Sequence, residues 1–409
     1  MTHPFDAAAL MAGAHQKENL FDWGPLPFEE PLRVLADSYA CTDLNDIGVH
    51  ILRSGLVHSL RMRLRAQEWI RRYPEITREV VAAPIVVVGM MRSGTTLLQR
   101  LLAADNRFHC AFGWEVVEVA PRLDYDWSAR EDPRIAVSEK REATSRELAP
   151  ELFAIHPMYA REPEEEIVFL SDSFLSHVPE SGAHVPRYRS WIDEQDFAPA
   201  YAYLHRMLQF LQWQKRRRAG EAGWERTRAG RDDLPAGRWI LKSPAHLGYL
   251  DALRAQFPDL HIVHMHRDPR ATIPSGASLN ATLHAMHTDE VDRYRVGAEW
   301  LHRMGWANDR AMGTRDGWAD ESTRCTDIEF TDAVADPIAQ AARVYSAIDL
   351  PMTSDTESAM RRWLVERPRE PARPPYYAAD FGLSDDEIDE RFAAYNSRFR
   401  PDATLSRRM

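Results

Sequence analysis

The chain has 409 residues and a formal net charge of −11, so it can bury a large core but lacks the excess of Lys and Arg that nonspecific nucleic-acid binding requires. Its three cysteines, Cys41, Cys110 and Cys325, lie far apart and form no CxxC motif. We therefore expect neither a disulfide framework nor a zinc site, and we expect a reducing compartment.

The N-terminal segment lacks the basic start and the long apolar core of a signal peptide. No stretch of the sequence reaches the roughly 18 apolar residues that a membrane span needs. We therefore expect a cytoplasmic protein with no membrane span and no nucleic-acid partner. The sequence does not indicate an oligomeric state.

Residues 1–80 show helix-like spacing of apolar residues and carry no catalytic motif, which predicts a helical N-terminal extension. Residues 81–409 are expected to form an α/β domain with a largely helical insertion at about 115–237, because that stretch is too long for a single crossover. Within the insertion, residues 215–237 are charged, contain several glycines and lack periodicity. This composition predicts a surface loop.

The first predicted strand is Ile85 to Val88, a continuous apolar run of the kind that is buried on both faces of a parallel sheet. Similar runs at residues 239–241, 261–265 and 325–330 alternate with helical patterns, of which one begins at Asp336-Pro337. The alternation predicts a doubly wound parallel sheet flanked by helices, which binds its ligands at the carboxyl ends of the strands. Lys242 and Arg267 both stand at such ends.

The end of the chain predicts a packed helix. Ser384 and Glu387 have the spacing of a capping box, and residues 388, 392, 395 and 399 are apolar or aromatic at helical spacing.

The turn after the first strand is close to a nucleotide-binding Walker A loop. Gly89 and Gly94 have the required spacing, but Thr95 and Thr96 follow where that loop has Lys and then Ser or Thr. Arg92 supplies a cation inside the loop instead, and its planar guanidinium suits a tetrahedral oxyanion. The loop is therefore expected to bind a phosphate-like group without the usual metal ion.

Four segments in one order carry a family resemblance: GMMRSGTTLLQRLL, LKSPAHL, HMHRDPRATIPSGASL and ADFGL. Together they resemble the sulfotransferases that use 3′-phosphoadenosine 5′-phosphosulfate (PAPS), and the first segment resembles the bacterial branch that is similar to tyrosylprotein sulfotransferases. The resemblance extends over roughly residues 84–400. It implies a P-loop-like α/β fold and sulfuryl transfer to an alcohol, phenol or amine.

The resemblance also implies how the donor is held. The loop would wrap the 5′-phosphosulfate, Arg267 and Ser275 would hold the 3′-phosphate, and Lys242 would lie near the oxygen that bridges phosphate and sulfate. Arg373 would reach the 3′-phosphate from a late loop. The implied donor-binding residues are Arg92, Ser93, Gly94, Thr95, Thr96, Lys242, Arg267, Ser275 and Arg373.

Three candidates compete as the general base, which must lie within hydrogen-bond reach of the acceptor proton. By resemblance, Glu115 matches the catalytic glutamate of tyrosylprotein sulfotransferases, with two extra residues before it, and it ranks first. His246 resembles the catalytic histidine of cytosolic sulfotransferases at a longer spacing, although a polar contact at a helix start explains it nearly as well. The acidic run 164–166 is the third candidate, although such runs are usually solvated.

These observations lead us to expect a cytoplasmic, metal-independent, PAPS-dependent sulfotransferase that acts on a small-molecule acceptor, with Glu115, Lys242, Arg92 and His246 as the candidate catalytic residues. One alternative is an ATP- and Mg²⁺-dependent phosphotransferase, which the missing Walker lysine disfavours. The other alternative is a noncatalytic PAP-binding protein.

Overall fold

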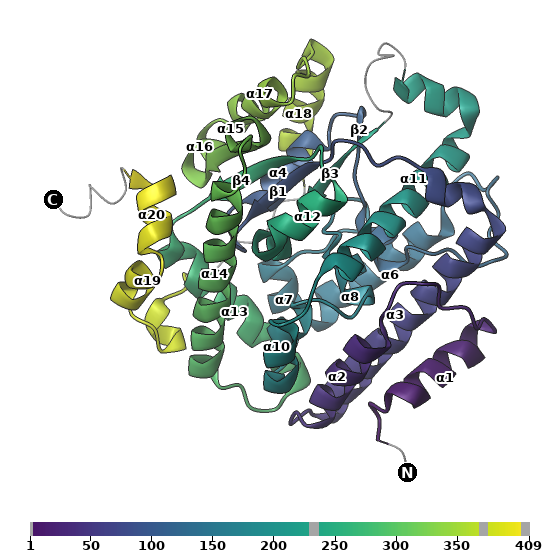
Figure 1. The fold of residues 1–409 in the computed structure, drawn as a ribbon, viewed down its shortest axis with the longest axis horizontal. Helices are drawn as coiled ribbons and strands as arrows, with labels where there is room; N and C mark the ends of the chain where they lie inside the picture. Colours follow the sequence, from purple (N-terminus) through teal and green to yellow (C-terminus); the bar gives the residue numbers. More distant parts are fainter. Residues whose placement is uncertain (1–2, 229–236, 368–374, 402–409) are drawn as a thin grey trace.

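The computed structural model describes residues 3–228, 237–367 and 375–401, whose arrangement is shown in Figure 1. The described strands form a five-stranded sheet in the order β2-β3-β1-β4-β5, with every neighbouring pair parallel. The strands are β1 (Ile85–Gly89), β2 (Phe108–His109), β3 (Arg238–Lys242), β4 (His261–His266) and β5 (Cys325–Glu329). The expected parallel α/β sheet is confirmed, and the sequence missed only the short edge strand β2 among these five.

Both faces of the sheet are buried, as the uninterrupted apolar run in β1 requires. Successive side chains of a strand point to opposite faces, so Ile85 and Val87 join one hydrophobic core while Val86 and Val88 join another. Ile85 pairs with Ile240 of β3 and with residue 261 of β4, which places β1 at the centre of the sheet.

The smaller core lies between one face of the sheet and the helices α4, α17 and α18. Leu98 and Leu101 of α4 contribute to it, together with Val344 of α17. Asp336 caps α17 by accepting a hydrogen bond from the backbone of residue 339, as predicted from the Asp-Pro pair. The helices on this side are α4 (Thr95–Leu102), α16 (Phe330–Ala335), α17 (Pro337–Ala347) and α18 (Ser354–Glu366). The short helix α15 (Glu321–Arg324) directly precedes β5.

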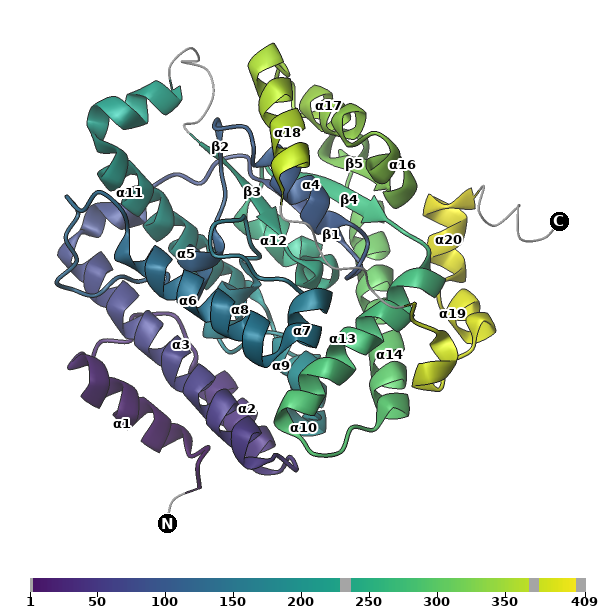
Figure 2. The ribbon, with the colours of Figure 1, turned by 180° about the vertical axis from the view of Figure 1, so that it is seen from behind.

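The larger core covers the other face and includes the N-terminal helices. Leu60 and Trp69 of α3 belong to the same cluster as Val86 of β1 and Leu204 of α11. Figures 1 and 2 show α3 beside α2 and α1, with α13 and α14 side by side across the molecule. These elements are α1 (Ala7–Glu18), α2 (Glu29–Ala40), α3 (Asp46–Arg72), η1 (Pro74–Arg78), α11 (Ala198–Arg228), η2 (Pro244–Tyr249), α12 (Leu250–Gln256), α13 (Pro269–His287) and α14 (Arg293–Asp316).

Short helices connect β2 to the long helix α11. They are α5 (Gly113–Val117), α6 (Pro133–Leu148), α7 (Pro150–Ile155), α8 (Ile167–Asp172), α9 (Val178–Gly182) and α10 (Pro186–Ile192). The loop predicted for residues 215–237 is wrong for residues 215–228, because α11 continues to Arg228. Charged residues of this stretch pack against the protein and extend the helix: the guanidinium of Arg217 lies over the rings of Tyr73 and Trp213, at 4.8 and 5.2 Å from their centroids.

The C-terminal segment contains η3 (Ala378–Phe381), α19 (Asp385–Arg391) and α20 (Ala393–Phe399). The predicted capping box is present, because Glu387 donates its backbone N–H to the hydroxyl of Ser384 and accepts the backbone N–H of Ser384 on its carboxylate. The single helix expected here is two helices with a break at Phe392.

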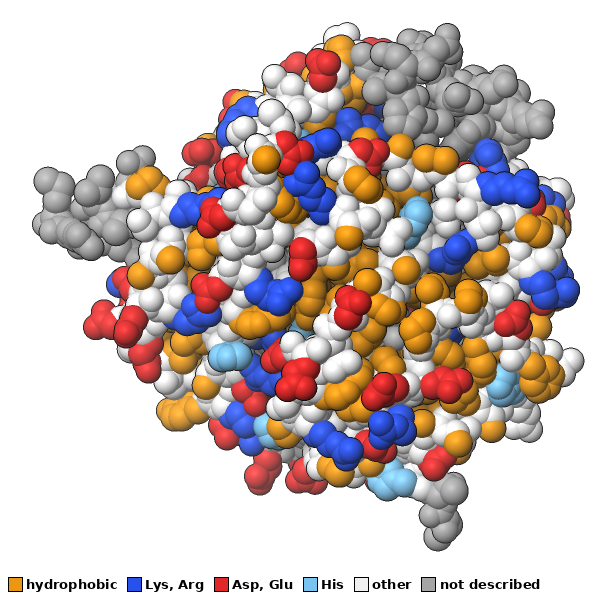
Figure 3. Space-filling model, in the orientation of Figure 1, with side chains coloured by type: hydrophobic (Ala, Val, Ile, Leu, Met, Phe, Trp, Pro, Cys, Tyr) orange, Lys and Arg blue, Asp and Glu red, His pale blue; other side chains and the backbone are white. Residues whose placement is uncertain are grey.

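The surface carries both signs of charge. Figure 3 shows acidic and basic side chains interspersed with hydrophobic ones on the face seen in Figure 1. Among the helices that the structure describes, none combines the length and the apolar composition that crossing a membrane demands.

Candidate functional site

The candidate site lies where parallel strands end. The chain leaves β1 at Gly89, β3 at Lys242 and β4 just before Arg267, and all three points share one edge of the sheet because the strands are parallel. A cavity of about 1160 Å³ opens at this edge. Its wall there includes Arg92, Thr96 and Arg267.

The loop from β1 to α4 has the backbone conformation that its glycines allow. Gly94 has φ +92° and directly precedes α4, whose first N–H groups have no partner within the helix. A Cβ atom at Gly94 would lie 2.7 Å from the ring of Phe330, so this position excludes larger residues. Arg92 also has a positive φ, 74°. The hydroxyl of Ser93 is fully buried in this loop and has no hydrogen-bond partner in the described part of the chain.

Arg92, Ser275 and Arg267 meet at the loop. The Nε of Arg92 donates to the hydroxyl of Ser275 at 3.1 Å, and its Nη1 donates to the backbone oxygen of Ile155 at 2.9 Å. Arg267 donates to the backbone oxygen of Arg92 at 2.6 Å and stacks on the ring of Phe330, 4.0 Å from its centroid. Burial lowers the pKa of the Arg267 guanidinium below its ordinary value. The structure thus brings together residues that are far apart in the sequence and that the family resemblance joined.

Lys242 lies under the start of α4. Its Nζ donates to the hydroxyl of Thr96 at 3.2 Å and to Oε1 of Glu165 at 2.5 Å. Lys242 is 1% exposed, whereas Thr96 and Glu165 both line the cavity. A cation, a hydroxyl and a carboxylate therefore meet at the carboxyl end of β3.

The three glutamates of the acidic run have different surroundings. Glu165 faces Lys242 at the cavity wall. Glu164 lies 3.7 Å from the guanidinium of Arg100. Glu166 is buried and accepts the backbone N–H of Lys242 at 3.0 Å.

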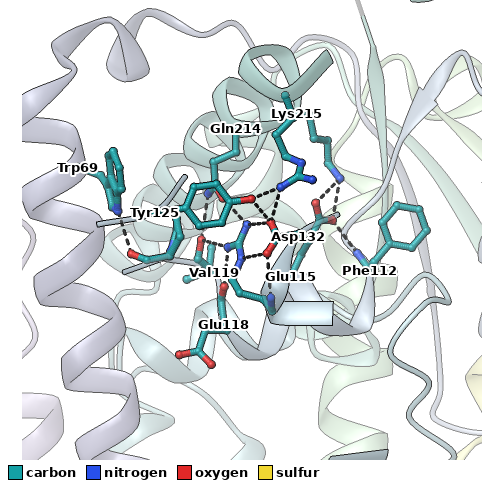
Figure 4. A network of polar contacts seen from close by, with 12 residues as sticks. Trp69, Phe112, Glu115, Glu118, Val119, Tyr125, Asp132, Gln214 and Lys215 are labelled. Atoms are coloured by element: carbon teal, nitrogen blue, oxygen red, sulfur yellow. Dashed lines mark hydrogen bonds and ion pairs between the residues drawn. The ribbon is translucent and has the colours of Figure 1, made fainter. Parts of the chain in front are cut away.

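Glu115 lies in a polar network away from the cavity (Figure 4). Its carboxylate accepts two hydrogen bonds from the ammonium group of Lys215, at 2.6 and 2.7 Å, and one from the backbone N–H of Phe112 at 2.9 Å. It is 3% exposed and, in the part of the chain that the structure describes, does not belong to the cavity wall. The structure therefore does not bring Glu115 together with Lys242 and Arg92.

His246 is also occupied elsewhere. Its Nε2 lies 2.7 Å from Oε1 of Glu166 and its Nδ1 lies 2.9 Å from the hydroxyl of Tyr201. The residue is fully buried, and the described cavity wall includes Pro244 and Ala245 but not His246. Arg373, the remaining residue named from the resemblance, lies outside the described residues.

One group of side chains has the composition of a metal site. His264, His266 and Asp327 place potential ligand atoms within 4.8 Å of one another, and no other such group occurs within residues 3–228, 237–367 and 375–401. The guanidinium of Arg315 lies among them, 2.7 Å from Asp327 Oδ1 and 3.0 Å from His264 Nδ1. Because a cation already pairs with the carboxylate, whose side chain is 41% exposed, we assign this group to an ion-pair network.

Sequence reasoning missed the wall of the cavity farther from the sheet. There, Asn280 of α13 and Trp300 of α14 are 5% and 6% exposed and line the cavity. Neither Asn280 Oδ1 nor Trp300 Nε1 has a hydrogen-bond partner among the described residues. The sequence offered one signal for this wall: Asn280 stands between two apolar residues of α13, Leu279 and Ala281. The sequence alone does not show whether such an asparagine faces a cavity or the solvent.

The fold and the site together define an α/β protein with an arginine-bearing loop at the carboxyl edge of a parallel sheet. The chain belongs to the sulfotransferase family, because the sequence model of that family matches residues 84–355. This match confirms the family resemblance drawn from the motifs.

Individual proteins agree with this assignment. The structure is similar to that of sulfotransferase STF1 from Mycobacterium tuberculosis, with 28% identity, a TM-score of 0.79 and coverage of 95% of this chain and 98% of the other. Its fold is also that of sulfotransferase STF9 from Mycobacterium avium, with 24% identity, a TM-score of 0.84 and coverage of 97% of each chain.

Two curated proteins, both named omega-hydroxy-beta-dihydromenaquinone-9 sulfotransferase Stf3, come from Mycobacterium bovis and Mycobacterium tuberculosis. Each is 24% identical to this chain over an alignment of 293 residues, and the match covers 65% of this chain. The match spans 63% of the length of those relatives.

Proposed function

We propose that this protein transfers a sulfuryl group from PAPS to a hydroxyl or amine group of a small-molecule acceptor, giving PAP and a sulfated product. One observation carries the proposal: Lys242 lies 3.2 Å from the hydroxyl of Thr96 and 2.5 Å from Glu165, at the carboxyl end of β3. Sulfuryl transfer needs a cation for the leaving oxygen and a base for the acceptor proton. The family assignment supports the same reaction.

The loop before α4 fits a phosphate-like donor. The open N–H groups at the start of α4 and the guanidinium of Arg92, which lines the cavity, are donors to an oxyanion. In the proposal, residues 92–96 bind the 5′-phosphosulfate, and Arg267 with Ser275 binds the 3′-phosphate. PAPS supplies the sulfuryl group, whose bond to the phosphate oxygen breaks as a bond to the acceptor oxygen or nitrogen forms.

Lys242 has the second role. Its ammonium group neutralises charge at the leaving oxygen, and Thr96 orients it by accepting a hydrogen bond at 3.2 Å. A bound anion also competes with Glu165 for Lys242, which frees the carboxylate to accept a proton. This competition links donor binding to the state of the base.

We propose Glu165 as the general base. It lines the cavity, whereas the carboxylate of Glu115 already accepts three hydrogen bonds and both ring nitrogens of His246 have partners. A base must lie within hydrogen-bond reach of the acceptor, and of these three side chains only Glu165 belongs to the described cavity wall. Glu164 also lines the cavity, but its carboxylate pairs with the guanidinium of Arg100 at 3.7 Å.

The acceptor is proposed to be largely apolar. Many of the residues that line the cavity are aliphatic or aromatic, including Leu152, Phe153, Leu279 and Trp300. The curated relatives are named for a hydroxylated menaquinone, and an apolar alcohol of that kind suits such a wall.

Two other functions remain as outcomes of the test. A phosphotransferase that uses ATP and Mg²⁺ would need the Walker lysine that Thr95 replaces. A noncatalytic PAP-binding protein would keep the loop but would have no use for the pairing of Lys242 with Glu165.

Calorimetric titration distinguishes these functions. We expect PAP to bind tightly with and without Mg²⁺ and with EDTA present, and ATP to bind weakly. Formation of PAP from PAPS with an apolar alcohol present then separates an enzyme from a binding protein. ATP binding that requires Mg²⁺, with no binding of PAP, would overturn the proposal.

A further inference from the structure

The cavity continues from the sheet edge into the space bordered by α13, α14, α7 and α9, which Figure 2 shows near one another below the sheet. Apolar side chains from these helices form much of this wall. They include Leu152, Phe153, Val178, Leu279, Val296 and Met304. This part of the cavity therefore suits an apolar body.

The charged side chains at this end neutralise one another. Glu180 lies 3.0 Å from Arg303 and 2.6 Å from His177, and Arg189 lies 3.4 Å from Glu299. A ligand charge placed here would lose its hydration without gaining an unopposed partner. Because the charged side chains of this part of the cavity wall already pair with one another, the wall favours a neutral ligand.

Asn280 and Trp300 are the exceptions to this internal pairing. Neither Oδ1 of Asn280 nor Nε1 of Trp300 has a hydrogen-bond partner in the described part of the chain, although both residues are more than nine-tenths buried. Buried polar groups without partners cost free energy, so native proteins usually satisfy them. Both residues line the cavity, where a ligand can supply the missing partner.

These two polar groups lie close together on one side of α13. A Cβ atom at Gly276 would collide with Nε1 of Trp300, so the indole N–H rests against the backbone of Gly276. Asn280 follows Gly276 by four residues, one helical turn, and is on the same face of the helix. Gly276 therefore leaves the space that the indole N–H occupies, one helical turn from Asn280.

We propose that Asn280 and Trp300 form a second recognition point in the acceptor site, at which they bind a neutral oxygen of an apolar alcohol, distinct from the hydroxyl that is sulfated. A hydroxyl group there accepts a hydrogen bond from the indole N–H of Trp300 and donates its own O–H to Oδ1 of Asn280, so both unpartnered atoms gain a partner. The acceptor class is then an apolar alcohol with a second neutral oxygen. This inference rests on the proposed function, since it assigns the same cavity to the acceptor.

The test compares α,ω-alkanediols, from octanediol to tetradecanediol, with the matching primary alkanols. Their dissociation constants are measured by calorimetry on PAP-saturated protein, so no turnover is needed. We expect the wild-type protein to prefer the diol by about tenfold at one chain length, because only that length places the second oxygen between Asn280 and Trp300. We expect the preference to fall to about unity in Asn280→Leu and to weaken in Trp300→Phe, which keeps the ring and removes the N–H donor.

Leu279→Met is the matched control, since it changes an apolar residue of the same wall and should keep the preference. If Asn280→Leu does not fold, Trp300→Phe and Gly276→Ala test the same recognition point through the indole. The same diol preference in every variant, or none in the wild type at any length, overturns the inference. A failure of PAP to bind instead overturns the proposed function, so the two failures are distinguishable.

Discussion

The ammonium group of Lys242 lies 2.5 Å from Oε1 of Glu165, and the two residues are separated by 77 positions in the sequence. Lys242 ends a strand of the sheet, whereas Glu165 belongs to the segment just before α8. Because both side chains are largely removed from water, each depends on the other for compensation of its charge. An anion that binds at the loop offers Lys242 a second partner and thereby changes the surroundings of Glu165.

Substitution of Glu165 tests its role as the base. Glu165→Gln keeps the size of the side chain and can still accept a hydrogen bond from Lys242, but its amide cannot take a proton. We expect kcat for sulfuryl transfer to fall by about 10² to 10⁴, with the affinity for PAP retained. Steady-state kinetics and calorimetry of the same sample measure the two effects.

Glu115→Gln is the matched comparison. We expect kcat to stay within about twofold of wild type, while the melting temperature falls because Lys215 loses its carboxylate partner. If Glu115→Gln loses turnover while Glu165→Gln retains it, the base is Glu115 and the proposed assignment is wrong.

Arg92→Ala removes the only cation of the loop between Gly89 and Gly94. It also removes the hydrogen bond from Arg92 to Ser275. We expect kcat/KM to fall by about 10² to 10³ and PAP binding to weaken, since a guanidinium is lost from an oxyanion site. Arg122→Ala is the control, because Arg122 is largely exposed and pairs with the exposed Asp124. Equal turnover of Arg92→Ala and wild type would contradict the assignment of the loop.

The sequence predicted the sheet and its loop because their signals are local. A strand buried on both faces appears as a continuous apolar run, so four of the five described strands were located before their neighbours were known. The loop was recognised from the spacing of Gly89 and Gly94, and the structure brings Arg92, Ser275 and Arg267 together there.

The choice among the candidate bases depends on contacts that spacing does not encode. Lys215 reaches Glu115 from 100 positions away, and Glu166 reaches His246 across 80 positions. The three glutamates of residues 164–166 are consecutive and yet contact Arg100, Lys242 and His246 respectively. Their roles follow from the packing of short helices, which hydrophobic periodicity predicts poorly.

Gly94→Ala tests the geometry of the loop without changing a charge. The positive φ of +92° is unfavourable for alanine, and the added Cβ would lie 2.7 Å from the ring of Phe330. We expect the affinity for PAP to fall by about tenfold or more, because Phe330 and the loop must move apart. Gly55→Ala, in the middle of α3 with no atom near the new Cβ, should instead stabilise the protein by about 0.5–1 kcal/mol. Titration calorimetry and thermal unfolding of both variants measure the contrast, and unchanged PAP affinity in Gly94→Ala would show that the loop tolerates a side chain.

Asp172 predicts a pH dependence of stability. This carboxyl group is buried at the end of α8, and burial raises its pKa from the ordinary value of 3.8 to about 7, although Ser59 and Arg63 oppose the shift. Between these values the native protein keeps the proton while the unfolded chain releases it. The contribution of this group to the free energy of unfolding therefore falls as the pH rises from about 4 to about 7. The fall is at most about 1.4 kcal/mol for each pH unit between the two pKa values.

Asp172→Asn imitates the protonated side chain at every pH. We expect its free energy of unfolding to lack this decline, so that the variant gains stability relative to wild type between pH values of about 4 and 7 and keeps a constant advantage above that range. Urea denaturation at a series of pH values measures the difference. Asp124→Asn is the control, because the Asp124 carboxylate is exposed and should leave the pH profile as it is in wild type. A parallel pH dependence for Asp172→Asn and wild type would mean that Asp172 is charged in the native protein, and that Arg63 compensates for its burial.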